Sequence, residues 1–519
     1  MYTLRVFTLL TVSAAISFST LNAQAAPVNG QHNAQPKNGM EVRNGSFTVN
    51  KGATFNGNGT SESSAGLAAT NARVVVQDGS FSDNYQCGIN ATKKSQLIIN
   101  GGSIHRNYIG PLVQNGSKIV VNKGDFRNDI SIYLANKSSA IINDGLLGGL
   151  YANNGLFAKD GSSATIRGGT FRDSGYGAEF YDAAPSVISS GYFTNNIYGV
   201  FLCSAKVTIN GGLFEQNGHA GVTTTVHEGG AKSFLKINGG TFRYGIAAGC
   251  EVISRSITTI NGGTFRENGY YGSELLIGSY PSTGGLRVAS GGQATVNGGI
   301  FTQNEGAGVQ AFLPDSFVTI NGGDFRKNGR ISPGGGYGAY IHSEAGAVIN
   351  GGDFSDNLEG IQIGLPYTPF DWEYKPNSKV TVNGGKFYNS KNSIRVDSGS
   401  ECEINGGDFN AFRTISASGF DSTVRITGGT FQSELFDFDA SFGSTIELTG
   451  EFSGYGSGKQ TVVITPATGQ GSISGTLQGR LKNSKKAQSF KYRVTPFSKI
   501  ILHVTGSPSS KASSSVNAS

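Results

Sequence analysis

Apolar and polar residues alternate in short segments along most of this chain. Val207 and Ile209 fall on one side of an extended backbone and Lys206 and Thr208 on the other, which is typical of a half-buried β-strand. A Gly-Gly pair follows, and Phe214 returns to the apolar side. Such phenylalanines recur about 22 residues apart, a period that indicates stacked structural repeats and not a globular core.

The tract Asn-Gly-Gly marks one corner of the repeat. Glycine tolerates positive φ, so two adjacent glycines suit a tight turn between strands. Coils stacked about 4.8 Å apart would bring successive phenylalanine rings into contact, and burying each ring contributes roughly 1.5–3 kcal/mol. We therefore predict a parallel β-helix with about 22 residues per coil. The literal tracts begin at Asn100, Asn210, Asn238, Asn261, Asn297, Asn321, Asn350, Asn383 and Asn405.

Asparagine often occurs three residues after the phenylalanine. We predict that these side chains form a ladder at a corner of the coil, with amides bonded to neighbouring coils and to backbone. A structural role is favoured over a catalytic one. These asparagines are Asn84, Asn107, Asn196, Asn217, Asn268, Asn304, Asn328 and Asn357.

The run Gly262–Asn268 reads Gly-Gly-x-Phe-x-x-Asn. It resembles the repeats of right-handed parallel β-helices in the pectin-lyase-like superfamily, and similar motifs mark polymorphic outer-membrane adhesins. The resemblance extends over roughly residues 40–455 and implies an all-β fold, a right-handed parallel β-helix. Because that superfamily includes lyases, hydrolases, epimerases and adhesins, the fold alone does not select an activity.

The N-terminus has the pattern of an export signal. Arg5 precedes an apolar stretch from Val6 to Phe18, and Ala23-Gln24-Ala25 suits cleavage, so we predict a signal peptide over residues 1–25. The mature protein is then expected to be secreted, either extracellular or associated with a cell wall. No later segment is long and apolar enough to span a membrane, and export makes nucleic acid an improbable partner.

The other end of the chain differs in charge. We predict the β-helix over residues 26–455, a basic β end cap over 456–505, and a disordered tail rich in Ser and Lys over 506–519. After Glu451 the sequence has no Asp or Glu but nine Lys or Arg. Lysines at a sheet end discourage edge pairing; the alternative is a patch that binds an acidic polysaccharide.

The cysteines and acidic residues give no sign of cross-links or metal. The four cysteines are separated by two or more coil periods, too far for disulfide geometry between stacked coils, so we predict free thiols. No cluster of Asp suggests calcium and no spacing suggests zinc. We therefore expect no metal and no cofactor.

Four coils are longer than the rest. The interval between phenylalanines grows to 28, 36, 29 and 33 residues between Phe214 and Phe387. The added segments flank the same strand on both sides, so the outward positions of that strand would form the floor of a groove. Those positions carry Glu251, Arg287, Gln310, Phe312, Tyr340, His342, Gln362, Arg395 and Asp397.

These residues suit a carbohydrate ligand. Glu251, Gln310 and Gln362 offer hydrogen-bonding groups, and aromatic rings from residues 366–376 could stack on sugar faces. The alternative is that these rings only pin a long loop to the solenoid. We predict a secreted protein that binds extracellular polysaccharide or acts as an adhesive surface component. The aromatic residues are Tyr367, Phe370, Trp372 and Tyr374.

Catalysis is the alternative function. Glycoside hydrolysis needs two carboxyl groups roughly 5–10 Å apart, whereas Glu251 and Asp397 lie several coils from each other. A polysaccharide lyase or epimerase acting on uronic-acid polymers needs a cation against the carboxylate and a base near C5. Arg287 or Arg395 could supply the cation. Tyr340 or His342 could act as the base.

Overall fold

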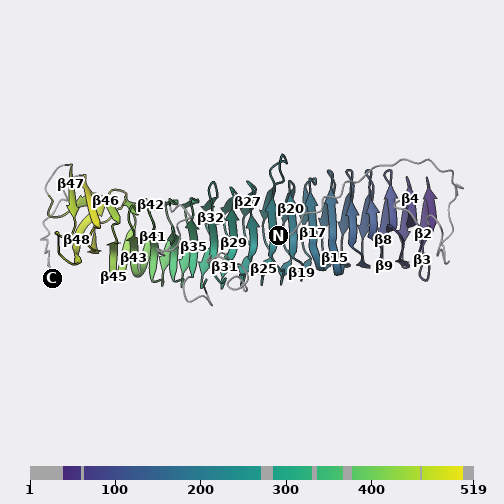
Figure 1. The fold of residues 1–519 in the computed structure, drawn as a ribbon, viewed down its shortest axis with the longest axis horizontal. Helices are drawn as coiled ribbons and strands as arrows, with labels where there is room; N and C mark the ends of the chain where they lie inside the picture. Colours follow the sequence, from purple (N-terminus) through teal and green to yellow (C-terminus); the bar gives the residue numbers. More distant parts are fainter. Residues whose placement is uncertain are drawn as a thin grey trace.

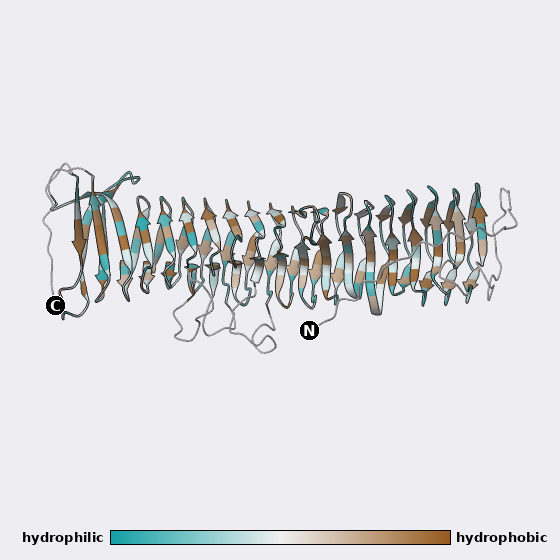
Figure 2. Ribbon diagram, turned by 45° about the horizontal axis from the view of Figure 1, so that its top comes forward, coloured by the Kyte–Doolittle hydropathy of each residue, from teal (hydrophilic) through white to brown (hydrophobic). Residues whose placement is uncertain are grey.

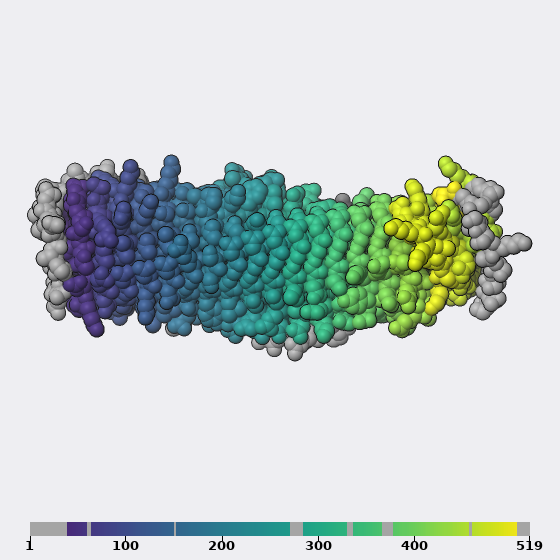
Figure 3. All heavy atoms as spheres, turned by 180° about the vertical axis from the view of Figure 1, so that it is seen from behind, coloured from purple at the N-terminus to yellow at the C-terminus, as the bar shows by residue number. Residues whose placement is uncertain are grey.

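The computed structural model describes residues 39–59, 64–269, 284–329, 336–365, 377–455 and 459–505. Within these residues every regular element is a β-strand, and the strands form one long rod (Figure 1). The coils follow sequence order along the rod, as the colour bands of the space-filling view show (Figure 3). The predicted all-β solenoid is therefore confirmed. The predicted signal peptide and C-terminal tail lie outside the described residues.

Each coil contributes three strands, and each strand pairs in parallel with its equivalent in the next coil. One coil consists of β23 (Ala220–Thr225), β24 (Phe234–Ile237) and β25 (Thr241–Arg243). They pair with β26 (Ala248–Val252), β27 (Ile257–Ile260) and β28 (Thr264–Arg266), respectively. We call the three resulting columns of strands the first, second and third stacks, beginning with the column of β23.

The rod makes about sixteen coils, because the third stack holds sixteen strands, from β3 (Thr54–Asn56) to β45 (Thr430–Ser441). The first stack contains β1 (Met40–Arg43), β4 (Ala65–Thr70), β7 (Cys87–Thr92), β10 (Ile109–Val113), β13 (Ile130–Leu134), β15 (Leu146–Lys159), β17 (Thr170–Tyr181), β20 (Tyr198–Cys203), β23, β26, β29 (Gly284–Ala289), β32 (Ala307–Phe312), β35 (Tyr337–His342), β38 (Glu359–Ile363), β41 (Asn392–Asp397), β43 (Asp408–Ser418), β45 and β49 (Gln488–Val494). Four of these strands, β15, β17, β43 and β45, also run through the third stack.

The core is a column of stacked phenylalanine rings, as predicted. Phe242 and Phe265 are in register on β25 and β28, and their ring centroids lie 4.7 Å apart with planes 6° from parallel. Apolar and polar residues alternate along the strands of each coil (Figure 2), so one side of every strand faces this interior. The continuous run consists of Phe171, Phe193, Phe214, Phe242, Phe265, Phe301, Phe325, Phe354, Phe387, Phe409 and Phe431.

The asparagines that follow the phenylalanines form a buried ladder, which confirms the second structural prediction. The Nδ2 of Asn304 donates to the Oδ1 of Asn328 at 3.0 Å and to the carbonyl of Phe265 at 3.1 Å. The Oδ1 of Asn304 accepts from the Nδ2 of Asn268 at 3.0 Å. Each amide therefore satisfies backbone at a turn and links its coil to its neighbours.

A second ladder, on the surface, was not predicted. From Asn238 onward, the asparagine of each Asn-Gly-Gly tract donates through Nδ2 to the Oδ1 of the asparagine one coil earlier, as Asn261 does to Asn238 at 2.8 Å. The glycines beside it are required by backbone geometry: Gly263 has φ of 107°, and a Cβ on Gly262 would lie 2.9 Å from the carbonyl oxygen of Asn238. The exposed ladder runs without a break through Asn210, Asn238, Asn261, Asn297, Asn321, Asn350, Asn383 and Asn405.

Parallel pairing gives way to antiparallel pairing at the C-terminal end. In the second stack β46 (Thr445–Phe452) pairs in parallel with β50 (Lys499–Val504), which pairs antiparallel with β47 (Gln460–Ile464). In the first stack β49 pairs in parallel with β45 and antiparallel with β48 (Ile473–Leu481). The parallel winding of the solenoid therefore ends within residues 459–505.

The four cysteines are buried and free, as predicted. Burial raises the pKa of the Cys87 thiol to about 12, so this group stays protonated and unreactive at neutral pH.

The two ladders lead to a prediction about stability. Asn304→Ala removes an amide on which several buried groups depend, so we expect it to lower the free energy of unfolding by about 1–3 kcal/mol. Asn321→Ala removes an exposed rung of the surface ladder, whose neighbours can bond to water, and should change it by less than about 0.5 kcal/mol. Thermal and urea unfolding followed by circular dichroism measure both variants. Equal losses in the two would show that burial does not set the strength of these ladders.

Candidate functional site

The outward side chains of the first stack form one continuous column. We call this column, from Tyr133 to Arg395, the outer face. The predicted site residues Glu251, Arg287 and Gln310 occupy successive rungs of it. In order, its members are Tyr133, Phe157, Glu179, Phe201, Thr223, Glu251, Arg287, Gln310, Tyr340, Gln362 and Arg395.

In the C-terminal half of the outer face, most of the residues predicted to form the groove floor are buried. Only the side chains of Arg287 and Arg395 keep substantial exposure, 23% and 31%. Several of these polar side chains pair with side chains on adjacent coils. The buried residues of the predicted groove floor are Glu251, Gln310, Tyr340, His342, Gln362 and Asp397, and Phe312 is half-buried. The predicted aromatic residues Tyr367, Phe370, Trp372 and Tyr374 lie outside the described residues.

Glu251 contacts two side chains that lower its pKa, His219 and Arg287. Its Oε2 lies 2.9 Å from the Nε2 of His219, and its Oε1 contacts the Nη1 of Arg287. Burial alone would raise the pKa of Glu251, but the hydrogen bond from His219 and the charge of Arg287 together lower it. The Arg287 guanidinium also lies 4.8 Å from the centre of the Phe312 ring. These contacts fix the position of Arg287, whose exposed part faces outward.

His342 and Tyr340 are poorly placed to act as bases. The amide Nε2 of Gln310 lies 2.9 Å from the Nε2 of His342. Since an amide nitrogen donates, that imidazole nitrogen accepts, and the proton sits on Nδ1 toward the hydroxyl of Ser343 at 2.9 Å. Burial lowers the pKa of His342 to about 3, so the ring is neutral. Its basic lone pair is already used, and Tyr340 is 1% exposed.

A second charged cluster surrounds Arg395. Its Nε lies 2.8 Å from the Oδ2 of Asp397, which also accepts from the Nε2 of Gln362 at 2.9 Å. Its Nη1 lies 4.0 Å from the Oε1 of Glu359, whose Oε2 accepts from Asn392 at 2.7 Å. Two carboxylates on adjacent coils therefore share one guanidinium.

Glu359 was missed by the sequence-based prediction. It lies at the start of β38, before the glycine from which outward positions were counted, so the alternation did not single it out. Burial raises its pKa to about 7, and burial also raises the pKa of Asp397. Of these two carboxyl groups, Glu359 has a pKa that makes it exchange a proton near neutral pH.

The N-terminal half of the outer face is aromatic and half-buried. The rings of Tyr133 and Phe157 stack at 5.2 Å, and those of Tyr176 and Tyr198 stack at 5.4 Å. Phe201 lies 5.2 Å from both Tyr176 and Tyr198. Sequence reasoning missed these rings because they belong to coils of ordinary length. The same count of outward positions, extended toward the N-terminus, would have found Phe157 and Phe201.

A carboxyl group stands among these rings. Glu179 lies between Phe157 and Phe201 on the outer face, and its Oε2 accepts from the Nδ2 of Asn154 at 2.6 Å. Burial raises its pKa to about 7. The site thus combines flat apolar surfaces with a carboxyl group and an amide, which can exchange hydrogen bonds with hydroxyl groups.

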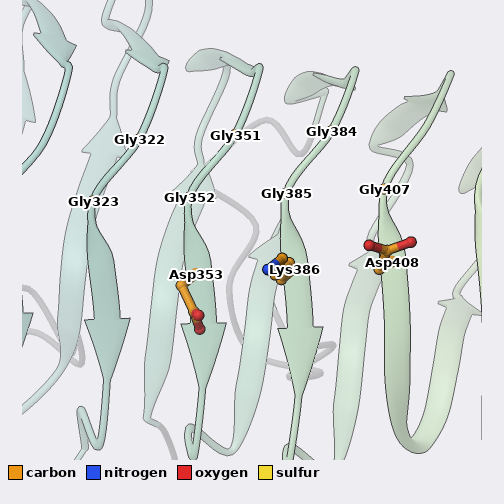
Figure 4. A pocket seen from close by; sticks show the side chains of 10 residues that line it. All are labelled: Gly322, Gly323, Gly351, Gly352, Asp353, Gly384, Gly385, Lys386, Gly407 and Asp408. Carbon is orange, nitrogen blue, oxygen red and sulfur yellow. The ribbon is translucent and has the colours of Figure 1, made fainter.

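Two shallow hollows lie elsewhere on the rod. One, of about 610 Å³, runs over the paired glycines of four coils, with Asp353, Lys386 and Asp408 along one side (Figure 4). The backbone geometry of the corner accounts for those glycines, and the bordering charges have mixed sign. The other, of about 730 Å³, is lined by Arg106, Arg127 and Arg172 among other residues. Each arginine there has an aspartate within 3.4 Å, so neither hollow matches the outer face in chemistry.

Glu359 makes stability depend on pH. Its folded-state pKa of about 7 lies above the usual 4.5, so the folded chain holds a proton that the unfolded chain has already released. The free energy of unfolding therefore falls as pH rises from about 4.5 to about 7, and this contribution levels off at higher pH. We expect the stability of Glu359→Gln relative to the unsubstituted chain to grow over that range. Thermal midpoints of both proteins at several pH values measure it, and a constant difference would contradict the assignment.

Comparison with known proteins supports the fold. Residues 132–282 match the family model described as a right handed beta helix region. No curated protein and no solved structure matches the chain. Among the described residues there is no helix long and apolar enough to cross a membrane. The likeness to outer-membrane adhesins stays a prediction. The family match and the three parallel stacks together identify the chain as a right-handed parallel β-helix protein.

Proposed function

We propose that this protein is secreted and binds extracellular polysaccharide along the outer face of the first stack. The observation that carries the proposal is the group of half-buried aromatic rings beside Glu179. Tyr133, Phe157 and Phe201 present ring surface on the same face as this carboxyl group. Sugar rings stack on aromatic faces through their C–H groups, while their hydroxyls need polar partners close by.

The spacing of the aromatic rings along the outer face suits a polymeric ligand. Tyr133 and Phe201 are three coil steps apart, or about 14 Å at the usual spacing between strands. A ligand that contacts both rings is therefore an oligosaccharide and not a single sugar. A rod that binds along its length in this way would also serve as an adhesive component of a cell wall.

The charged half of the outer face favours an acidic polysaccharide. Arg287 and Arg395 remain partly exposed and lie four coil steps apart, about 19 Å. Each guanidinium is already oriented by a buried carboxylate, Glu251 or Asp397. Pre-positioned arginines bind carboxylates with little loss of side-chain entropy. Tyr367, Phe370, Trp372 and Tyr374 stay candidates for additional sugar contacts.

A polysaccharide lyase or epimerase is the second candidate function. It is favoured by Glu359, whose pKa of about 7 suits a general base at neutral pH and which lies 4.0 Å from Arg395. The arginine could neutralise a uronate carboxylate while the carboxyl group removes the proton at C5. Against this role, Glu359 is 2% exposed, so a substrate could reach its carboxyl group only if the atoms that bury it moved aside. Binding is therefore the preferred function.

The binding proposal predicts the effect of removing the rings. Phe157→Ala with Phe201→Ala should weaken binding to the recognised polysaccharide by at least about tenfold, since two stacking contacts are lost. Affinity electrophoresis against pectin, alginate and neutral glucans, together with a glycan array, measures retention. The matched control is Phe317→Ala, which removes a ring that is 40% exposed on the second stack. Unchanged retention in the double variant would refute the proposed site.

The two candidate functions differ in their products. We expect no rise in the absorbance of unsaturated uronates when the protein is incubated with polygalacturonate or alginate, because binding breaks no bond. A rise that disappears in Glu359→Gln while retention of the polymer persists would establish the lyase instead. Proton exchange at C5 without chain cleavage, followed by NMR in deuterated water, would identify an epimerase.

A further inference from the structure

Three phenylalanine side chains stand exposed at one corner of the rod near its C-terminal end. Phe420, Phe442 and Phe497 are 71%, 72% and 86% exposed, the largest values among the exposed large apolar side chains. They lie in the turns that join the first stack to the second. The strands on either side of these turns pair with one another, so the rings belong to three successive coils. We call these residues the phenylalanine edge.

The backbone at this edge is unfavourable for phenylalanine. Phe442 and Phe497 have φ of 53° and 69°, a region that asparagine and glycine tolerate but bulky side chains avoid. In other coils, apart from Leu313 with φ of 69°, the same turn places polar residues at positive φ, where they suit both the backbone and the solvent. Those residues include Asn115, Asn136, Asp160, Asp182, Ser204, Ser290 and Ser398.

The exposed rings therefore add little to the fold. They bury little surface, and two of them impose backbone strain. The ring of Phe420 lies against the backbone of the next coil, because a Cβ on Gly443 would fall 2.5 Å from its Cδ1. That ring therefore lies along the surface of the rod and not in its core. A contiguous apolar group of this kind marks an interaction surface.

The three coils that carry the edge have a small basic excess, with ten Lys or Arg and seven Asp or Glu over residues 408–505. Residues 459–505 contain eight Lys or Arg and no Asp or Glu. Arg480 pairs with Glu451 and Arg493 with Asp439, whereas Lys499 is exposed two residues after Phe497. Asp421, which follows Phe420, is the carboxylate nearest to the edge in sequence. The partner should therefore be apolar in part and carry acidic groups that can meet Lys499.

We infer that the phenylalanine edge inserts into the headgroup region of an anionic lipid surface. Aromatic rings that project from a convex corner can enter a lipid interface, and neighbouring lysines attract acidic headgroups. A second copy of the chain fits less well. Three rings exposed to this degree offer roughly 450 Å², about half of the roughly 800 Å² that each partner of a stable interface buries. Sugar sites are concave and rich in hydrogen-bonding groups, and this edge is neither.

The test compares vesicle binding by the full mature chain and by an edge variant. The variant Phe420→Ser, Phe442→Asn, Phe497→Asn removes all three rings and places asparagine where φ is positive, so its thermal midpoint should not fall. We expect the unsubstituted chain to sediment with vesicles of phosphatidylglycerol and phosphatidylcholine, and the variant to bind at least about tenfold more weakly. Lys499→Ser should weaken binding by a smaller factor that shrinks as salt is added.

The matched control is Tyr85→Ser with Tyr108→Ser, which removes two rings that are 57% and 55% exposed near the other end of the rod. This control should bind vesicles as the unsubstituted chain does. Equal vesicle binding by the edge variant and the unsubstituted chain would overturn the inference. So would loss, in the edge variant alone, of binding to an insoluble polysaccharide or of self-association measured by analytical ultracentrifugation, with no vesicle binding by either protein.

Discussion

Parallel pairing between equivalent strands of successive coils is the constraint on which this structure depends. It fixes the spacing along the rod, so any residue type that recurs at one position of the coil meets its own copy on the next. The phenylalanine column follows directly: Phe242, Phe265 and Phe301 are in register, and their rings stack at 4.7 Å with planes 4–6° from parallel. The asparagine ladders follow for the same reason, because an amide both donates and accepts.

The same constraint governs the outer face. Side chains at one outward position are forced into contact whether or not they are alike, so a charge there must find its partner on the neighbouring coil. Glu251 meets Arg287 in this way, and Gln362 meets Arg395 beside Asp397. Buried ion pairs cost desolvation that their attraction only partly offsets. Their presence on one face of the rod therefore points to a requirement beyond stability, and oriented arginines for an acidic ligand would meet it.

Some residues depart from the type that usually occupies their position in the repeat, and the requirements of the fold do not explain them. In most other coils the turn between the first and second stacks carries a polar residue at positive φ, most often Asn, Asp or Ser. Phe442 and Phe497 break that rule at the basic end of the rod. The aromatic residues of the outer face differ from the phenylalanine edge because Phe157 and Phe201 occupy strand positions that suit them. They are notable only because they share a face with Glu179. The two surfaces are distinct in location and in chemistry, so the proposed polymer contact and the inferred lipid contact can be tested separately.

The sequence by itself determined the coil, the phenylalanine column, the buried asparagine ladder and the free thiols, because each depends on periodicity, and periodicity is a local property of the chain. It also gave the outward order of Glu251, Arg287 and Gln310 correctly. Only the tertiary structure decided how those side chains are partnered. Burial lowers the pKa of His342 to about 3, beside its contact with Gln310, and burial raises the pKa of Glu359 to about 7. Such properties arise from contacts between residues on neighbouring coils, which are roughly 20 to 40 positions apart in the sequence. They can therefore be identified only once the stacking of the coils is known.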